Sequence, residues 1–228
     1  MIQCMALRKV PFSVGEWYHA YSRGLDKRTI FESDRDYKRF QQYLYLSNTP
    51  EPLRRDNLER MPHHELFSLL RSQTLVSIGA YCLMPNHFHL LLNETTDGGI
   101  TRFMQKLGTA YTMYFNIKYE RVGGLLTKPF RAKHIADDRH FQHVAQYIHL
   151  NSAELSEPGF KRGKVRSAKS LINRMQGYRY SSFPDYCGEN RAEKEILDAE
   201  SFDLLSATMP PANELIEDAI GYFSELRE

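Results

Sequence analysis

Apolar and polar residues alternate along several short stretches of the chain, and this period of two predicts β-strands. The stretch EWYHAYS (16–22) predicts one strand. LVSIGAYCL (75–83) and HFHLLLN (87–93) predict two more, joined by a turn at Met84-Pro85-Asn86. A further short strand is expected at 130–135, so the chain is expected to contain a β-hairpin and two other strands.

Between these strands the apolar residues recur every three or four positions, which is typical of helices with one buried face. One helix is predicted to begin at Asp34 as its N-cap, and a longer one to follow Asp97-Gly98-Gly99 and run to about Lys118. A third helix is predicted over 138–150. Its core face is expected to consist of Phe141, Val144, Ala145 and Ile148.

Along the chain these elements follow the order β-α-β-β-α-β-α. Two split β-α-β units of this kind form a ferredoxin-like antiparallel sheet. The predicted class is therefore α+β, with the helices packed on one face of the sheet and the other face free for a ligand. Residues 1–186 are predicted to form one domain, and residues 187–228 an acidic, helical C-terminal extension.

Charge distinguishes these two parts of the chain. The formal net charge of +2 over 228 residues divides into +10 over residues 1–186 and −8 over residues 187–228. A basic body favours a polyanionic partner. The acidic part is expected either to form a solvated pair of helices or to fold back over the basic face and compete with that partner.

Composition excludes several classes of protein. No apolar run approaches the roughly 18 residues that cross a bilayer, so no membrane partner is expected, and the N-terminus shows no signal-peptide pattern. Cys4, Cys82 and Cys187 are far apart and form neither a disulfide framework nor a zinc-binding pair. These features favour the cytoplasm as the compartment.

The pair His87 and His89 is the sharpest chemical feature of the chain. Residues two apart on a strand point to the same face, so both imidazoles are expected to project together while Phe88 points into the core. Two neutral imidazoles this close can share one divalent metal ion. The alternative is a pair of surface histidines or of hydrogen-bonded core histidines.

A second cluster of polar residues lies on the predicted helix 138–150. At about 100° per residue, His140, His143, Tyr147 and Asn151 fall on one stripe beside the core face. A tyrosine beside a metal site can act as a nucleophile, and Asn151 can add an oxygen ligand. His140 and His143 are candidates for supporting such a nucleophile, for example by taking its phenol proton. The alternatives are a surface histidine and an ordinary boundary tyrosine.

Two stretches resemble the motifs of the HUH single-tyrosine transposases, and especially of their REP-associated branch: AYCLMPNHFHLLL (80–92) and YHAYSRG (18–24). The resemblance continues through residues 101–133, QYIHLNSAEL (146–155) and Tyr180-Ser181-Ser182. It covers roughly residues 10–186, with the motifs in the family's order and suitably spaced.

In that family a histidine pair binds a divalent metal ion and a helix tyrosine attacks DNA. The matching residues here are His87 and His89 for the metal and Tyr147 for the attack, with Asn151 at the place of a third polar ligand. The resemblance implies Mg²⁺ or Mn²⁺ as the cofactor. It also implies a single-stranded DNA endonuclease and strand transferase that forms a 5′-phosphotyrosine intermediate at hairpin-bearing or palindromic repeats. The family includes monomers and dimers, so a homodimer is one of the two states that the resemblance allows.

Basic residues outside the motifs are candidates for contacting DNA phosphates. They are Arg131 and Lys133 at the expected strand 130–135, and Lys161, Arg162, Lys164 and Arg166 in the basic stretch 159–169, which is expected to form a loop. Two rival functions fit the pattern: a catalytically silent protein that binds DNA hairpins and descends from a transposase, and a ferredoxin-like RNA-binding module. The intact His87, His89 and Tyr147 favour the enzyme over the silent protein.

Overall fold

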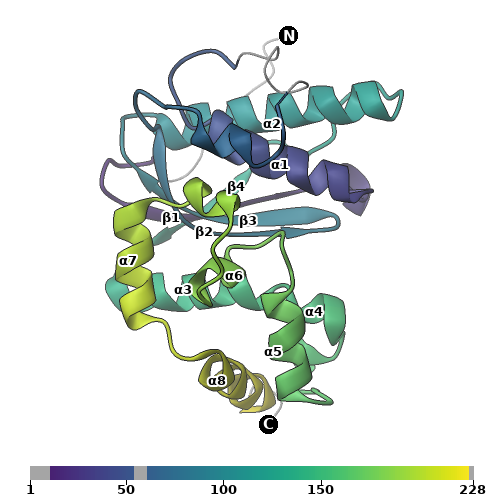
Figure 1. The fold of residues 1–228 in the computed structure, drawn as a ribbon, viewed down its shortest axis with the longest axis vertical. Helices are drawn as coiled ribbons and strands as arrows, with labels where there is room; N and C mark the ends of the chain where they lie inside the picture. The colour runs from purple at the N-terminus through teal and green to yellow at the C-terminus, as the bar shows by residue number, and fades with distance from the viewer. Residues whose placement is uncertain (1–10, 54–60, 226–228) are drawn as a thin grey trace.

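The structure is a computed structural model, and it describes residues 11–53 and 61–225. Its strands are β1 (Trp17–Arg23), β2 (Val76–Met84), β3 (His87–Glu94) and β4 (Arg131–Ile135). Its α-helices are α1 (Asp34–Leu46), α2 (Gly99–Lys118), α3 (Asp138–Leu150), α4 (Ala153–Ser156), α5 (Ala168–Gln176), α6 (Phe183–Tyr186), α7 (Ala199–Thr208) and α8 (Ala212–Glu225), and a short 3-10 helix, η3, covers Phe160–Arg162 (Figure 1). The predicted strands, the hairpin and the three predicted helices are all present.

In the described part of the chain, four strands form one antiparallel sheet in the order β2-β3-β1-β4. Two split β-α-β units produce this order, because β1 and β3 become central neighbours and β2 and β4 lie at the edges. The predicted α+β class and the ferredoxin-like sheet are therefore confirmed.

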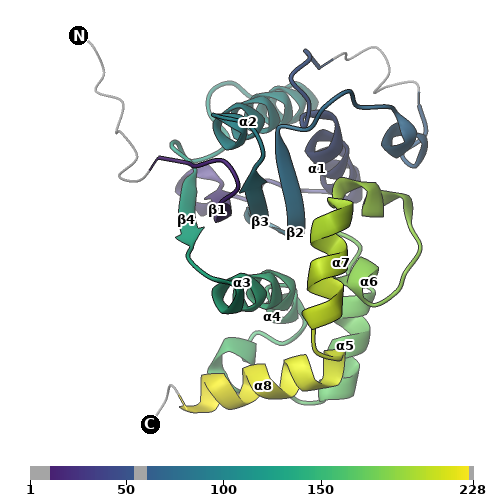
Figure 2. The ribbon, with the colours of Figure 1, turned by 90° about the vertical axis from the view of Figure 1, so that its left-hand side faces the viewer.

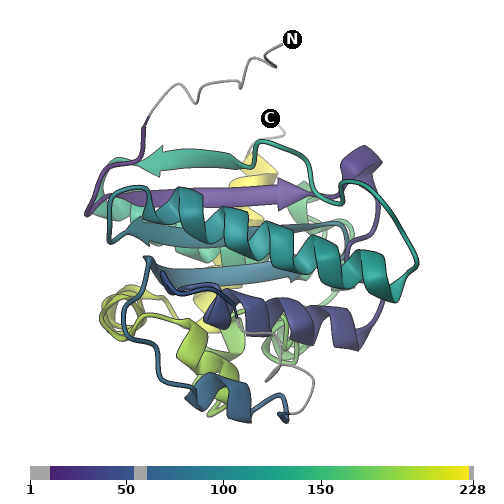
Figure 3. The same ribbon diagram turned by 90° about the horizontal axis from the view of Figure 1, so that it is seen from above.

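Helices α1 and α2 lie side by side over one face of the sheet (Figure 3). Phe103 of α2 is fully buried there, and Phe88 of β3 belongs to the same cluster, with its ring centroid 4.8 Å from that of Phe40 in α1. Because side chains alternate along a strand, His87 and His89 are turned to the opposite face.

We predicted that the opposite face would be free for a ligand, and this prediction is wrong. Helices α3 and α7 cover that face (Figures 1 and 2). Phe141, Ala145 and Ile148 of α3 are buried in a second cluster against Cys82 and Leu91 of the sheet. The expected core face of α3 is thus correct. It is buried on this side of the sheet because an apolar stripe on a helix packs on an apolar surface, and β2 and β3 provide one here. Helices therefore pack on both faces of the sheet.

Two local predictions also differ from the structure. The N-cap of α1 is Ser33 rather than Asp34, because Ser33 forms a capping box with Asp36, whose carboxylate accepts a hydrogen bond from the Ser33 backbone at 3.0 Å. The basic segment 159–169, which we expected to be a loop, contains η3 and then enters α5 at its N-cap Ser167.

The two C-terminal helices pack onto the rest of the chain. Leu205 of α7 belongs to the cluster beneath the sheet, whereas Leu215 and Ile216 of α8 are buried against Phe160 and Leu171. The domain boundary at residue 186 stays a prediction. None of the described helices combines the length and the apolarity that a membrane crossing requires.

Candidate active site

His87 and His89 lie on the α3 side of the sheet, where the alternation along β3 places them. Their ring centroids are 5.0 Å apart and the ring planes are nearly perpendicular, at 86°. His87 is half-buried and His89 is buried. Nδ1 of His87 lies 2.6 Å from Oδ1 of Asn86, and since that oxygen is an acceptor, Nδ1 carries the proton and Nε2 keeps its lone pair.

A third imidazole, His19 of β1, joins this pair, although the sequence analysis did not single it out. Its Nε2 lies 2.8 Å from Nδ1 of His89, and the two rings stack with centroids 5.0 Å apart. The available signal was the spacing of His19, Tyr21 and Arg23 along one strand, which places them on a common face. Only the pairing of Tyr21 with His89 shows that this is the histidine face.

Burial keeps all three imidazoles neutral. Desolvation lowers the pKa of His87 to about 4 and the pKa of His89 to about 2, and neighbouring groups add to both shifts. Desolvation, reinforced by the charge of Lys133, lowers the pKa of His19 to about 4. At neutral pH each ring therefore has one nitrogen lone pair for a metal ion or a hydrogen-bond donor.

Tyr147 of α3 faces these imidazoles. Its ring centroid is 5.7 Å from that of His89 and 5.7 Å from that of His19, with interplanar angles of 86° and 72°. The side chain is 39% exposed, so a ligand from solution can reach it. Ala145 and Ile148, on the neighbouring stripe of α3, are fully buried and fix the helix in this rotation. The structure therefore brings the predicted nucleophile and the histidine pair together within one chain.

Asn151 follows the last residue of α3, one turn after Tyr147, and its side chain is tied to the helix end. Its Nδ2 donates a hydrogen bond to the carbonyl oxygen of Tyr147 at 2.8 Å, and its Oδ1 accepts one from Nζ of Lys161 at 3.5 Å. Nζ of Lys161 also lies 2.9 Å from Oε2 of Glu154 and 5.6 Å from the centroid of the Tyr147 ring. The amide oxygen of Asn151 is thus turned away from the helix backbone, and Lys161 places a positive charge over the tyrosine ring.

The other predicted site residues are more exposed. Arg131 and Lys133 of β4 pair in register with Tyr21 and His19 of β1, so they point to the histidine face of the sheet. His143 is exposed on α3, one turn before Tyr147. Three further basic side chains are exposed in the segment that contains η3: Arg162, Lys164 and Arg166.

No group of three or more histidine, cysteine or acidic side chains is placed to hold a metal ion among the residues that the structure describes. His19 does not complete such a group with the histidine pair, because its Nε2 is engaged in the hydrogen bond with His89. A metal ion on His87 and His89 would therefore need further oxygen ligands of another kind, from an amide, a water molecule or a phosphate.

Comparisons with known proteins point to transposases. Residues 53–151 match the family model described as transposase IS200 like. Among solved structures, the chain is similar to a REP-associated tyrosine transposase bound to a REP hairpin, with a TM-score of 0.51 and 11% identity, over 81% of this chain and 87% of that chain. No curated protein matches the chain.

At 11% identity the structural match concerns the fold, whereas the family match concerns the sequence itself. The matched segment contains His87, His89, Tyr147 and Asn151. The resemblance stated from the motifs is therefore confirmed: residues 53–151 match the IS200-like transposase family, and the chain has a fold similar to that of a REP-associated tyrosine transposase.

Proposed function

We propose that this transposase is a metal-dependent single-stranded DNA endonuclease and strand transferase in which Tyr147 is the nucleophile. The observation that carries the proposal is the placement of the partly exposed Tyr147 ring, 5.7 Å from the ring of His89. A reachable phenol beside two neutral imidazoles suits nucleophilic attack on a phosphodiester, because the imidazoles can hold a cation against the phosphate charge.

The donor atoms of the site fit a divalent cation. Nε2 of His87 keeps its lone pair. In the tautomer of His89 whose Nδ1–H donates a hydrogen bond to His19, Nε2 of His89 keeps its lone pair as well. The amide oxygen of Asn151 is the third protein ligand that we propose. Imidazole together with oxygen ligands suits Mn²⁺ and Mg²⁺, which would offset the negative charge that develops on the phosphate.

The tyrosine performs one bond exchange. Oη of Tyr147 forms a bond to phosphorus, and the bond between phosphorus and the 3′ oxygen breaks. The phenol proton leaves to solvent and the 3′ oxygen takes up a proton, so the products are a free 3′-OH and a 5′-phosphotyrosine. Attack by a 3′-OH on this intermediate reverses the exchange, which is how one residue both cleaves and joins strands.

Hairpin-bearing single-stranded DNA is the substrate that we propose, since the similar solved transposase is bound to a REP hairpin. Arg131 and Lys133 beside the histidines supply positive charge for its phosphates, as do Arg162, Lys164 and Arg166. We place the activity in the cytoplasm, because Cys82 and Cys187 are free thiols.

A covalent-capture assay tests the proposal. A labelled hairpin oligonucleotide with single-stranded flanks is incubated with the protein and Mn²⁺ and then resolved under denaturing conditions. The wild-type chain is expected to carry attached DNA, and chelation of Mn²⁺ to prevent the attachment. Tyr147→Phe is expected to lose the adduct but to keep its affinity for the hairpin, because only the hydroxyl is removed.

The rival functions predict other results in the same assay. A wild-type chain that binds the hairpin without ever forming an adduct is the catalytically silent protein. Binding that needs no metal and prefers ribose over deoxyribose indicates the RNA-binding module. An adduct that persists in Tyr147→Phe would move the nucleophile to another residue.

A further inference from the structure

Lys161 differs from the other basic residues of its segment in what its side chain contacts. Its ammonium lies over the Tyr147 ring, forms an ion pair with Glu154 and reaches Oδ1 of Asn151. Arg162 and Lys164, by contrast, are exposed. Lys161 also lies beyond residue 151, where the match to the transposase family ends. Its position beside the tyrosine is therefore not part of the matched family segment.

The hydrophobic core holds this lysine in place. Phe160, the residue before it, is fully buried in a cluster with Leu171 of α5 and Ile216 of α8. Phe160 begins η3, and the side chain of the next residue reaches Asn151 at the end of α3. Lys161 is consequently fixed at its backbone, although its side chain is 35% exposed and open to a ligand.

The charge of Lys161 acts on the candidate active site. Its ammonium lies 5.6 Å from the centroid of the Tyr147 ring. A cation at this distance attracts an anion that is bound at the tyrosine hydroxyl.

We propose that Lys161 donates a hydrogen bond to a non-bridging oxygen of the phosphate that Tyr147 attacks. The inference rests on the proposed function, which places the reacting phosphate at the tyrosine hydroxyl. An ammonium has three donors, and Glu154 and Asn151 engage two of them, the second only at 3.5 Å. Glu154 keeps the ammonium in position before DNA arrives, and the phosphate then takes the remaining donor or replaces Asn151.

The test compares removal of the lysine charge with removal of the phosphate charge. Hairpin oligonucleotides that carry one neutral methylphosphonate in place of each phosphate in turn are bound to the Tyr147→Phe protein, which cannot form the adduct. Affinity is measured by fluorescence anisotropy with and without the additional change Lys161→Met, which keeps the aliphatic stem. Lys161→Arg serves as the charge-retaining variant.

We expect one methylphosphonate position, at the cleaved phosphate, to weaken binding about tenfold when Lys161 is present and less than about twofold in the Lys161→Met variant. We also expect Lys161→Met to slow adduct formation in the Tyr147 protein at saturating DNA by at least about tenfold, with Lys161→Arg retaining most of the rate. Equal methylphosphonate penalties with and without the lysine at every position would overturn the inference.

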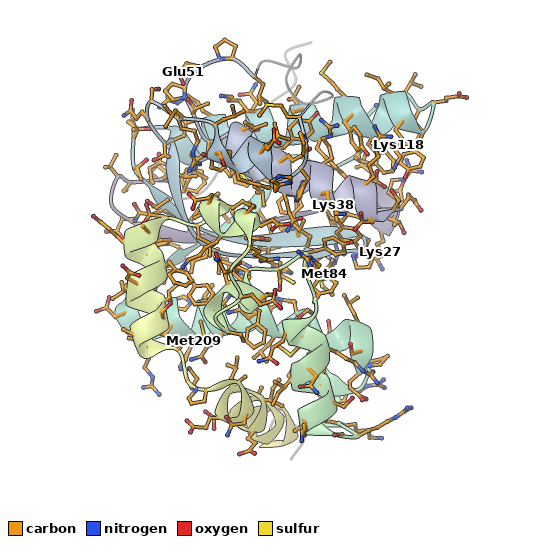
Figure 4. All side chains as sticks on the ribbon, viewed as in Figure 1. Lys27, Lys38, Glu51, Met84, Lys118 and Met209 are labelled. Carbon is orange, nitrogen blue, oxygen red and sulfur yellow. The ribbon has the colours of Figure 1, made fainter. Side chains whose placement is uncertain are left out.

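A matched control is Lys38→Met. Lys38 is also a partly exposed lysine paired with a carboxylate, Asp34, at 2.8 Å, but it lies on α1, across the sheet from α3 (Figure 4). This variant is expected to leave the methylphosphonate pattern and the adduct rate unchanged. If the wild-type chain forms no adduct but the methylphosphonate effect at one position depends on Lys161, the proposed function fails and the phosphate contact stands. If the adduct forms and no such dependence exists, only this inference fails.

Discussion

Substitution of His19 tests a residue that orients a proposed metal ligand without binding the metal ion itself. Its Nε2 shares a hydrogen bond with Nδ1 of His89, which restrains the orientation of the ring that we propose as a ligand. His19→Phe keeps an aromatic ring in this buried position but removes the hydrogen bond. We expect the Mn²⁺ concentration that gives half of the maximal adduct rate to rise about 10- to 100-fold.

The same titration has an internal comparison. His89→Ala removes a proposed ligand, so its adduct rate is expected to stay low at every Mn²⁺ concentration, whereas that of His19→Phe recovers at high Mn²⁺. A half-saturating concentration in His19→Phe equal to that of the wild type would show that this imidazole has no part in holding the metal.

Asp36 is a buried carboxylate that fastens the start of α1 to the end of α2. It accepts hydrogen bonds from Nζ of Lys118 at 2.6 Å, from Oη of Tyr119 at 2.7 Å and from Oη of Tyr114 at 2.8 Å. Burial alone would raise the pKa of Asp36, but these hydrogen bonds outweigh it and lower the pKa below its usual value. The ionised form is therefore the one that stabilises the fold.

Asp36→Asn is expected to lower the free energy of unfolding at pH 7 by about 3 kcal/mol, because Lys118 loses its charged partner and an amide cannot accept as many hydrogen bonds. A carboxylate whose pKa is lowered in the folded state stabilises the fold fully above its unfolded pKa of about 4. This stabilisation is lost as the pH falls through the folded-state pKa. The difference between wild type and variant in urea unfolding should therefore be smaller at pH 3 than at pH 7. An equal difference at both pH values would contradict the role of the ionised carboxylate.

Local periodicity in the sequence predicted the helices and strands that lie within one stretch of chain, but it did not predict how they pair and pack. The hairpin of β2 and β3 and the apolar stripes of α2 and α3 were correct, because each is encoded within one stretch of chain. The side of the sheet that α3 covers was not predicted, since an apolar stripe can be buried on any apolar surface. His19 was missed for a related reason: its face is set by strand pairing at long range.

The candidate site shows the same division. His87 and His89 share a face through strand alternation alone, and Tyr147 was found through its motif and its helix stripe. Lys161 was identified only as one charge among several in a basic segment. Its contact with Tyr147 depends on the burial of Phe160 by α5 and α8, and no local pattern encodes that packing.

The packing of α8 predicts that this helix supports the active site from a distance. Ile216 is fully buried against Phe160, the residue before Lys161. Ile216→Ala is expected to lower the free energy of unfolding by about 2–4 kcal/mol through the cavity that it leaves. Because η3 loses part of its support, adduct formation is expected to slow while Lys161 itself is unchanged.

Leu204→Ala provides the comparison for this change. Leu204 lies on α7 and is 56% exposed, so its truncation should change the free energy of unfolding by no more than about 0.5 kcal/mol and leave the adduct rate alone. Chemical denaturation and the capture assay measure both variants. An adduct rate in Ile216→Ala equal to that of the wild type would show that α8 does not support the site.

The acidic C-terminal part is not a fully solvated pair of helices, because it packs against the basic body. Its helix α8 packs through Leu215 and Ile216 onto η3 and α5, which belong to the basic part of the chain. Apolar contacts thus join helix α8 of the acidic part to the basic part of the chain. Competition between the acidic part and DNA, one of our two expectations, stays a prediction.

The connection of α3 to the sheet indicates which chain supplies the tyrosine. Only Ala136 and Asp137 separate β4 from α3, and Asp137 caps the helix by accepting a hydrogen bond from the His140 backbone at 2.7 Å. Exchange of α3 between two chains would have to lift Phe141 and Ile148 out of the core. We therefore propose that Tyr147 acts on the histidines of its own chain, also in the homodimer that the resemblance allows.

A mixing experiment checks this assignment. Tyr147→Phe and the double variant His87→Ala with His89→Ala are produced together in one cell, so that mixed dimers can form, and the purified mixture is tested for covalent capture of the hairpin. If each chain uses its own tyrosine, neither variant can complement the other, and the mixture forms no more adduct than the two variants measured separately. If the tyrosine helix were exchanged, a mixed dimer would contain one site with both histidines and the tyrosine, and the adduct would return. The short linker and the buried face of α3 lead us to expect no return.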